Sequence, residues 1–377
     1  MAEQTYSAEF GGKTLTVKLG KLAQQAGGSV VVQYGETTVL ATAVLGRASD
    51  RDYFPLMVDY EEKYYAAGKI KGSNWIKREG RPSDEAVLTR RVIDRSIRPR
   101  FDQNSRTEVQ CVATVLSFDK ENDPDMPALF AVSTALMISN VPYNGPVSSV
   151  RVGRKDGAFI LNPTYKEREE SDLDIIVSGT TDRINMIEAG ANVVSEDIMG
   201  QAIEEGFESL APLNKLQKEI AEKHGIEKTD VAVSKPDDEL VKQVREFIEP
   251  KLDVALYAKT KKEHYAGQAS AKEELLGHIQ TVYAKTPKLE THLAHVDSLF
   301  EDSVNRVVHR NVLENDKRVD GRKMDELRAL SAEVGVIPHT HGNGLFLRGE
   351  TQALTVLTLG APGQEQWVES MEIDLTK

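Results

Sequence analysis

Segment 74–81 of the sequence, NWIKREGR, places a tryptophan beside several cations. Trp75 offers a flat ring on which a base can stack, while Lys77, Arg78 and Arg81 can neutralise adjacent phosphates. A stacking ring with nearby cations is what a site for single-stranded nucleic acid requires. A buried tryptophan flanked by solvated cations is the other interpretation, and the residue types alone do not decide between the two.

More arginines follow this segment at helical spacing. Ser83 is the predicted N-cap of a helix that Pro99 ends. Arg91, Arg95 and Arg98 lie four and three residues apart, which places them on one face of that helix. This face is either a solvated basic surface or an extension of the phosphate-binding segment. The residues predicted to form the apolar stripe of the helix are Leu88, Val92 and Ile93.

The arginine-rich stretch is positively charged, although the chain as a whole is negatively charged. The net charge of −12 argues against non-specific attraction to nucleic acid. Residues 69–100 nevertheless contain ten Lys or Arg against four acids. A site for a polyanion is therefore expected here, and the candidate nucleic-acid-binding residues are Trp75, Lys77, Arg78, Arg81, Arg91, Arg95 and Arg98.

Other groups of polar side chains in the sequence do not complete a metal-binding motif. Four acids alternate over residues 119–125 like the first ligands of a calcium loop, but Pro124 and Phe130 replace the glycine and the bidentate glutamate of that motif. We predict that these acids are loop and helix-cap residues: Asp119, Glu121, Asp123 and Asp125. His339 and His341 lack an evident third metal ligand nearby. The single cysteine, Cys111, lies in an apolar run and is expected to be a buried thiol.

The element that positions the candidate segment is a predicted β-hairpin at residues 28–46. Apolar residues alternate on both sides of a turn at Gly35, which supplies the positive φ that such a turn tends to need. Residues 342–360 repeat this stretch without a gap. Two similar hairpins could arise because strands in general share the same residue preferences. A further alternating run follows each copy, however, and after the second copy it consists of Met371, Ile373 and Leu375. We therefore predict a duplicated domain whose second copy is incomplete at Lys377.

The chain of 377 residues is long enough for two or three domains. Strands at the start of the chain, a buried helix at 127–139 and a helix at 195–223 predict an α+β domain over residues 1–229. Amphipathic helices predict an all-helical spacer over 230–310, with a capping box at Ser270 and Glu273. The second copy is predicted to begin at 311 and to occupy 311–377.

No run of the sequence approaches the ~20 apolar residues that a membrane span needs. The first ten residues, MAEQTYSAEF, lack the features of a signal peptide. We therefore expect a cytoplasmic protein.

Several longer motifs of the sequence are more specific. One group consists of KREGRPS at 77–83, LTRRVIDRSIRPRF at 88–101 and NDPDMPALFAVSTAL at 122–136. A second group consists of KRVDGRKMDELRALSAEVG at 317–335 and THGNGLFLRGETQAL at 340–354. The first group resembles the first core of the bacterial polynucleotide phosphorylase family, and the second group resembles the start of the second core of that family. Family members usually carry two adjacent phenylalanines where this chain has Trp75 and Ile76, so the stacking role would rest on Trp75.

The resemblance implies a fold and a function. The fold would consist of duplicated RNase PH-type (ribosomal protein S5 domain 2-like) domains separated by an all-helical domain, with the second copy truncated. The activity would be phosphorolysis of single-stranded RNA from its 3′ end, releasing nucleoside diphosphates, with a role in mRNA degradation. The alternative is a non-catalytic RNA-binding ring subunit of an exosome-like assembly.

The resemblance also implies partners and the place of the chemistry. Inorganic phosphate would be the co-substrate and Mg²⁺ the cofactor, with the phosphate site and the metal ligands beyond Lys377. We therefore expect no catalytic and no metal-binding residue within this chain. A homotrimer whose basic loops line a central aperture is expected, together with membership of an RNA-degradation complex.

Overall fold

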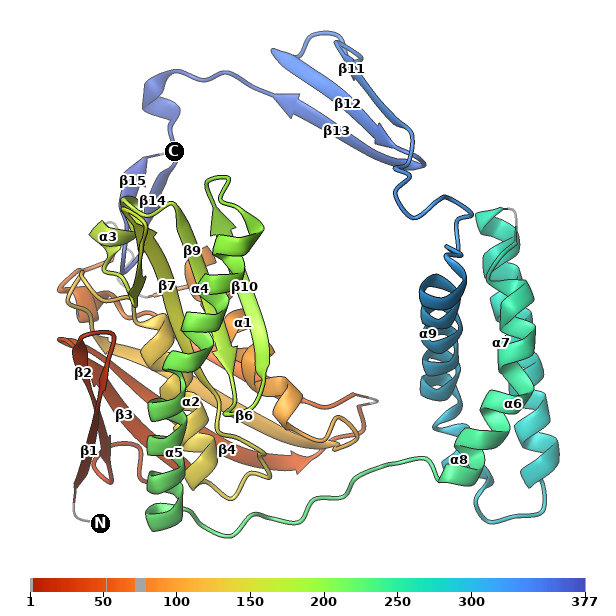
Figure 1. Ribbon diagram of the computed structural model, residues 1–377, viewed down its shortest axis with the longest axis horizontal. Helices are drawn as coiled ribbons and strands as arrows, with labels where there is room; N and C mark the ends of the chain where they lie inside the picture. The colour runs from red at the N-terminus through yellow and green to blue at the C-terminus, as the bar shows by residue number, and fades with distance from the viewer. Residues whose placement is uncertain (1–2, 52, 72–78, 259, 377) are drawn as a thin grey trace. The chain divides into compact units, whose positions relative to one another are not determined.

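The computed structural model describes residues 3–51, 53–71, 79–258 and 260–376. The chain forms two compact units (Figure 1). Unit 1 comprises Met1–Ser234 together with Gln366–Lys377, and unit 2 comprises Lys235–Glu365.

The first sheet of unit 1 has the strand order β1-β2-β3-β4-β6-β5. Its strands are β1 (Gln4–Phe10), β2 (Lys13–Leu19), β3 (Gly28–Tyr34), β4 (Thr37–Ala48), β5 (Leu56–Glu61) and β6 (Thr107–Ser117). Neighbouring strands are antiparallel except β5 and β6, which are parallel. The predicted hairpin is confirmed as β3 and β4: Tyr34 pairs with Thr37, and Gly35 has a φ of 62°.

The second sheet of unit 1 has the order β10-β9-β7-β8 and is antiparallel. Its strands are β7 (Ser148–Lys155), β8 (Ala158–Leu161), β9 (Leu173–Gly179) and β10 (Ile184–Ala191). The helices of the unit are α1 (Asp84–Ile97), α2 (Asp125–Ile138), α3 (Tyr165–Glu169), α4 (Glu196–Ser209) and α5 (Ala211–His224), with short 3₁₀ turns η1 (Tyr64–Ala67) and η2 (Arg98–Arg100).

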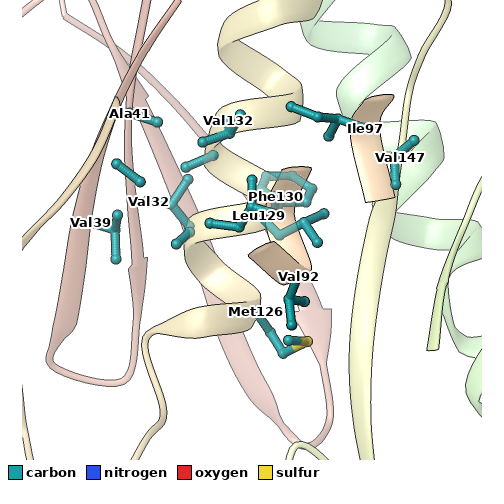
Figure 2. Close-up of a cluster of buried hydrophobic side chains, with 14 of the residues drawn as sticks. Val32, Val39, Ala41, Val92, Ile97, Met126, Leu129, Phe130, Val132 and Val147 are labelled. Carbon is teal, nitrogen blue, oxygen red and sulfur yellow. The ribbon is translucent and has the colours of Figure 1, made fainter. Parts of the chain in front are cut away.

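Helix α2 is the centre of the core of unit 1. It packs on β3 and β4 of the first sheet and on β7 of the second, so every residue of the helix except Met137 is buried. Figure 2 shows Leu129 and Val132 of α2 among Val32 of β3 and Val39 and Ala41 of β4. The packing at one point brings backbone against backbone: a Cβ on Gly28 would lie 2.1 Å from the carbonyl oxygen of Ala135. A glycine is required where β3 crosses the helix.

Three helix predictions need correction. Leu88 is 51% exposed and does not belong to the apolar stripe of α1, whereas Val92 and Ile93 are buried as predicted. The helix expected over 195–223 is two helices, because Leu210 ends α4 and Pro212 begins α5. Ser270 lies inside a continuous helix and caps nothing there.

Unit 2 begins with helices α6 (Asp238–Ala255), α7 (Lys261–Tyr283), α8 (Leu289–Leu293) and α9 (Val296–Asn315). The capping box of α7 is formed by Thr260 and Glu263, ten residues before the predicted one. The helices share a separate hydrophobic core, to which α6, α7 and α9 contribute Leu240, Val244, Ile248, Leu275, Ile279, Leu299, Phe300 and Val307.

The predicted repeat is confirmed in backbone geometry. Strands β11 (Leu330–Val334), β12 (Gly342–Arg348) and β13 (Thr351–Leu357) pair in the order β11-β12-β13, as β2, β3 and β4 do. Arg348 pairs with Thr351 across a turn in which Gly349 has a φ of 61°, nearly that of Gly35.

The strand expected around Met371 is a hairpin instead. A short 3₁₀ turn, η3 (Pro362–Gln364), precedes β14 (Trp367–Glu369), which pairs with β15 (Asp374–Thr376). Met371 lies in the turn between these strands and is buried in the core of unit 1.

Candidate nucleic-acid interface

The candidate segment is part of a loop whose two ends are joined. The backbone N–H of Tyr64 donates to the Glu79 carboxylate at 2.8 Å, and Lys63 pairs with the same carboxylate at 3.6 Å. The Ser83 hydroxyl donates to Glu62 at 2.7 Å. These contacts hold residues 62–64 against 79–83 and so close the base of the loop.

Ser83 has two roles at this junction. Its hydroxyl oxygen accepts the Ala86 N–H at 3.0 Å, which confirms Ser83 as the N-cap of α1. Its hydroxyl hydrogen is donated to Glu62, whose pKa is raised by burial although this hydrogen bond lowers it. The start of α1 and the base of the loop are therefore fixed by the same side chain.

The structure separates the candidate nucleic-acid-binding residues into three groups. Trp75, Lys77 and Arg78 lie within 72–78, outside the described residues. The other candidates are described, and Arg81, Arg91 and Arg95 are exposed, without a hydrogen-bond or ion-pair partner among the residues that the structure describes.

Arg98 is the exception, since it is held by its own domain. Its guanidinium binds both carboxylate oxygens of Asp94, at 2.9 and 2.7 Å, and donates to the backbone carbonyls of Phe54 and Leu56. A phosphate would have to compete with these contacts. Arg81, Arg91 and Arg95 are thus better placed than Arg98 to take up a polyanion.

A buried charge network near the start of α2 was not anticipated from the sequence. Arg151 of β7 binds Asp125 and lies 2.7 Å from Asp174, while Arg168 of α3 binds Asp123 at 2.6 Å. Burial opposes ionisation of Asp125, but the charge and hydrogen bond of Arg151, together with a hydrogen bond from Asp123 and the Arg168 charge, lower the pKa of that carboxyl. Burial and the neighbouring Asp125 charge raise the pKa of Asp123 well above its usual range. These two acids therefore join β7 and α3 to α2 and do more than cap a loop.

The remaining candidates have local structural roles. Asp119 accepts backbone N–H groups of Glu36, Glu121 and Asn122, as expected for a loop residue. His341 accepts the Leu359 N–H through Nδ1. Cys111 is fully buried, as predicted, and burial raises the pKa of its thiol. In the described part of the chain, no group of three or more His, Cys, Asp or Glu is arranged to hold a metal ion.

Three family models match successive parts of the chain. Residues 11–142 match domain 1 of the 3′ exoribonuclease family, and residues 145–209 match its domain 2. Residues 239–323 match the model described as the RNA binding domain of polyribonucleotide nucleotidyltransferase.

Curated proteins show the same similarity over the whole chain. Polyribonucleotide nucleotidyltransferases of Streptococcus agalactiae serotype Ia and Anoxybacillus flavithermus are 43% and 44% identical to it, over 100% of this chain and 53% of each relative. The chain belongs to the polyribonucleotide nucleotidyltransferase family. It spans about half the length of the curated relatives it matches. Among solved structures, rice (Oryza sativa) Rrp46 aligns with 58% of the chain and 94% of its own length, at 13% identity and a TM-score of 0.45.

Membership of the polyribonucleotide nucleotidyltransferase family gives the fold its name. The two sheets and α1–α5 form an RNase PH-type domain, β11–β13 repeat its first strands, and the all-helical region lies between them in sequence. The sequence had suggested only a spacer for these helices, whereas the family model that matches them is described as RNA-binding. The signal that was available is the aromatic–basic run KTKKEHY at 259–265. A search of the described helices finds none that is both long and apolar enough to cross a membrane.

Proposed function

We propose that this chain guides single-stranded RNA in a polyribonucleotide nucleotidyltransferase that degrades RNA from its 3′ end with phosphate. The observation that carries the proposal is the similarity of the whole chain to proteins of that name, with the exoribonuclease and RNA-binding models in succession. The loop closed by Glu79, with Arg81 and the exposed arginines of α1 beside it, supplies the cations that an RNA backbone needs.

The proposed reaction is a displacement at phosphorus. An oxygen of inorganic phosphate attacks the 3′-terminal phosphodiester, a new P–O bond forms, and the bond to the 3′ oxygen of the preceding nucleotide breaks. The products are a nucleoside diphosphate and RNA shorter by one residue. We propose Mg²⁺ as the ion that offsets the developing charge, and we assign it no ligand in this chain.

The same proposal includes assembly and location. A homotrimer would bring three basic loops to one aperture through which a single strand passes. Participation in an RNA-degradation complex and in mRNA decay in the cytoplasm is part of this proposal. Exclusion of double-stranded RNA from such an aperture is its simplest consequence.

The test measures RNA binding and product release separately. The 377-residue chain, and a version extended to the length of the curated relatives, are incubated with 3′-labelled single-stranded RNA, with and without phosphate and Mg²⁺. We expect both forms to bind RNA, and the extended form to release nucleoside diphosphate only when phosphate is present. Release of nucleoside monophosphate without phosphate would overturn phosphorolysis. Binding without any release by the extended form would support the non-catalytic ring subunit instead.

A further inference from the structure

The β14–β15 hairpin is anchored in unit 1 through its turn. Met371 is fully buried among the core side chains of that unit, and Ser370 is nearly so. The turn is held rigid from within, because the Ser370 hydroxyl accepts the N–H groups of Glu372 and Ile373 at 3.2 and 3.1 Å. A segment that follows the repeated strands in sequence therefore packs in the first domain (Figure 1).

We call the loop that residues 62–64 and 79–83 close the RNA-guiding loop. Two side chains at its base bind the turn of the hairpin. The Tyr64 hydroxyl donates to the Glu369 carbonyl at 2.8 Å, and Lys69 Nζ donates to the Ser370 carbonyl at 3.1 Å. Tyr64 is the first residue of η1, and Lys69 follows Gly68, the C-cap of η1. Both acceptors are backbone atoms of the hairpin, so the contact depends on its position and not on its side chains.

Tyr64 also holds the returning end of the loop. Its backbone N–H donates to Glu79, as described above, while its hydroxyl reaches the hairpin. On the other side of the turn, Glu372 lies beside Tyr165 of α3 and within electrostatic range of Glu62, the residue that binds Ser83. The hairpin thus touches the network that fixes both ends of the loop.

We infer that the β14–β15 hairpin positions the RNA-guiding loop, with Tyr64 and Lys69 as the positioning residues. The inference rests on the proposed function for its consequence, since the loop matters only if the chain binds RNA. When the hairpin is docked, η1 is fixed on both sides, and the described base of the loop is held in place. When it is undocked, η1 keeps only its contacts within the first domain.

The first test compares RNA affinity in variants of the full chain. Met371→Asp places a carboxylate in the core position and undocks the hairpin. Tyr64→Phe removes one hydrogen bond and keeps the ring. We expect the dissociation constant for single-stranded RNA to rise about tenfold in the first variant and about threefold in the second. Tyr65→Phe is the matched control, because Tyr65 is 59% exposed and its hydroxyl has no partner in the described part of the chain.

A double-mutant cycle separates positioning from direct contact with RNA. If Tyr64 acts through the hairpin, Tyr64→Phe has no further effect on affinity once Met371→Asp has undocked the turn. If the two effects add, Tyr64 binds RNA itself and the inference is wrong. An equal loss of affinity in Tyr65→Phe would also overturn it.

Hydrogen exchange gives a readout that does not depend on RNA. Amides of residues 64–69 should exchange faster in Met371→Asp and Tyr64→Phe than in the parent chain, while amides of α2 stay protected. Unchanged exchange at residues 64–69 in both variants would overturn the inference. A chain that shows the exchange effect but binds no RNA would instead contradict the proposed function.

Discussion

Arg95 of α1 and Arg98, the C-cap of that helix, stand three residues apart and differ in what they bind. Arg98 has Asp94 and two backbone carbonyls as partners, whereas Arg95 is exposed. We expect Arg95→Ala to lower the magnitude of the salt slope of RNA binding by about 0.7, the value for one phosphate contact to a single strand. Arg98→Ala should instead lower the free energy of unfolding by about 1.5 kcal/mol and leave the slope unchanged.

The measurement for this pair is RNA affinity against salt concentration, with denaturant unfolding of each variant alongside. An equal change of slope in both variants would show that Arg98 leaves its internal partners to bind RNA. No change in either would remove α1 from the interface.

The buried network gives a second expectation at the scale of single residues. Arg151→Met leaves Asp125 without its cation in a buried site, which typically costs about 3–5 kcal/mol, whereas Asp174 keeps Arg168 as a partner. Arg183→Met is the matched control, since Arg183 and Asp182 form a solvent-exposed ion pair, which contributes little to stability. Urea unfolding of the two variants is the measurement. A loss in Arg151→Met as small as that in the control would mean that the network is well solvated.

Sequence reasoning predicts the cations of the loop but does not anticipate this network, for a physical reason. A sequence pattern reveals charged residues that are close along the chain, such as Lys77 and Arg78. Arg151 meets Asp125 across 26 residues, and Arg168 meets Asp123 across 45. Only the packing of β7 and α3 beside α2 brings these charges together.

At the scale of elements, the two copies of the hairpin offer a controlled comparison. Gly28 of β3 is pressed against the backbone of α2, whereas a Cβ on Gly342, its counterpart in β12, would meet only the Leu357 side chain at 3.6 Å. We expect Gly28→Ala to destabilise unit 1 by about 3 kcal/mol, because either the strand or the helix must move. Gly342→Ala should change stability by less than about 0.5 kcal/mol. Thermal unfolding of both variants is the measurement. Equal losses of stability in the two variants would show that α2 and β3 can move apart at little cost.

Elements were predictable where alternation is strict and the turn residue is diagnostic. The β3–β4 hairpin followed from its apolar alternation and Gly35. Helix ends were harder, because Pro212 is compatible with either a kink or a new first turn, and Ser270 suits a cap only if the preceding residues are not already helical. Leu88 satisfied the helical spacing but lies where nothing packs over α1 in the described structure.

At the scale of the whole molecule, the chain has two hydrophobic cores, and the described residues of the repeated strands β11–β13 belong to neither. The core of unit 1 includes α2 and both sheets, and that of unit 2 includes α6, α7 and α9. In the described structure, no side chain of β11–β13 is buried. We expect amides of β11–β13 to exchange at least about a thousandfold faster than those of β2–β4, which have the same strand order and a helix over them. Exchange mass spectrometry on the full chain provides the measurement, and equal protection of the two copies would contradict it.

The docked turn of the β14–β15 hairpin is also a proton-binding site. Burial and then the Glu62 charge raise the pKa of Glu372 to about 7, with Asp125 and Glu85 adding repulsion and the Tyr165 hydroxyl opposing the shift. Undocking would return Glu372 toward the ordinary value of 4.5. Between these two values the docked state holds a proton that the undocked state releases, so docking weakens as pH rises through this window and is weakest above 7.

Glu372→Gln should remove most of this dependence. Trp75 and Trp367 are the two tryptophans of the chain, so Trp75→Phe leaves Trp367, on β14, as the fluorescent probe of docking. The fluorescence anisotropy of Trp367 should fall between pH 5 and 8 in Trp75→Phe and stay constant when Glu372→Gln is added. An equal fall in both proteins would show that carboxylates other than Glu372 bind the protons that control docking. Mild acidity would then favour the docked hairpin and, through Tyr64, stabilise the base of the RNA-guiding loop.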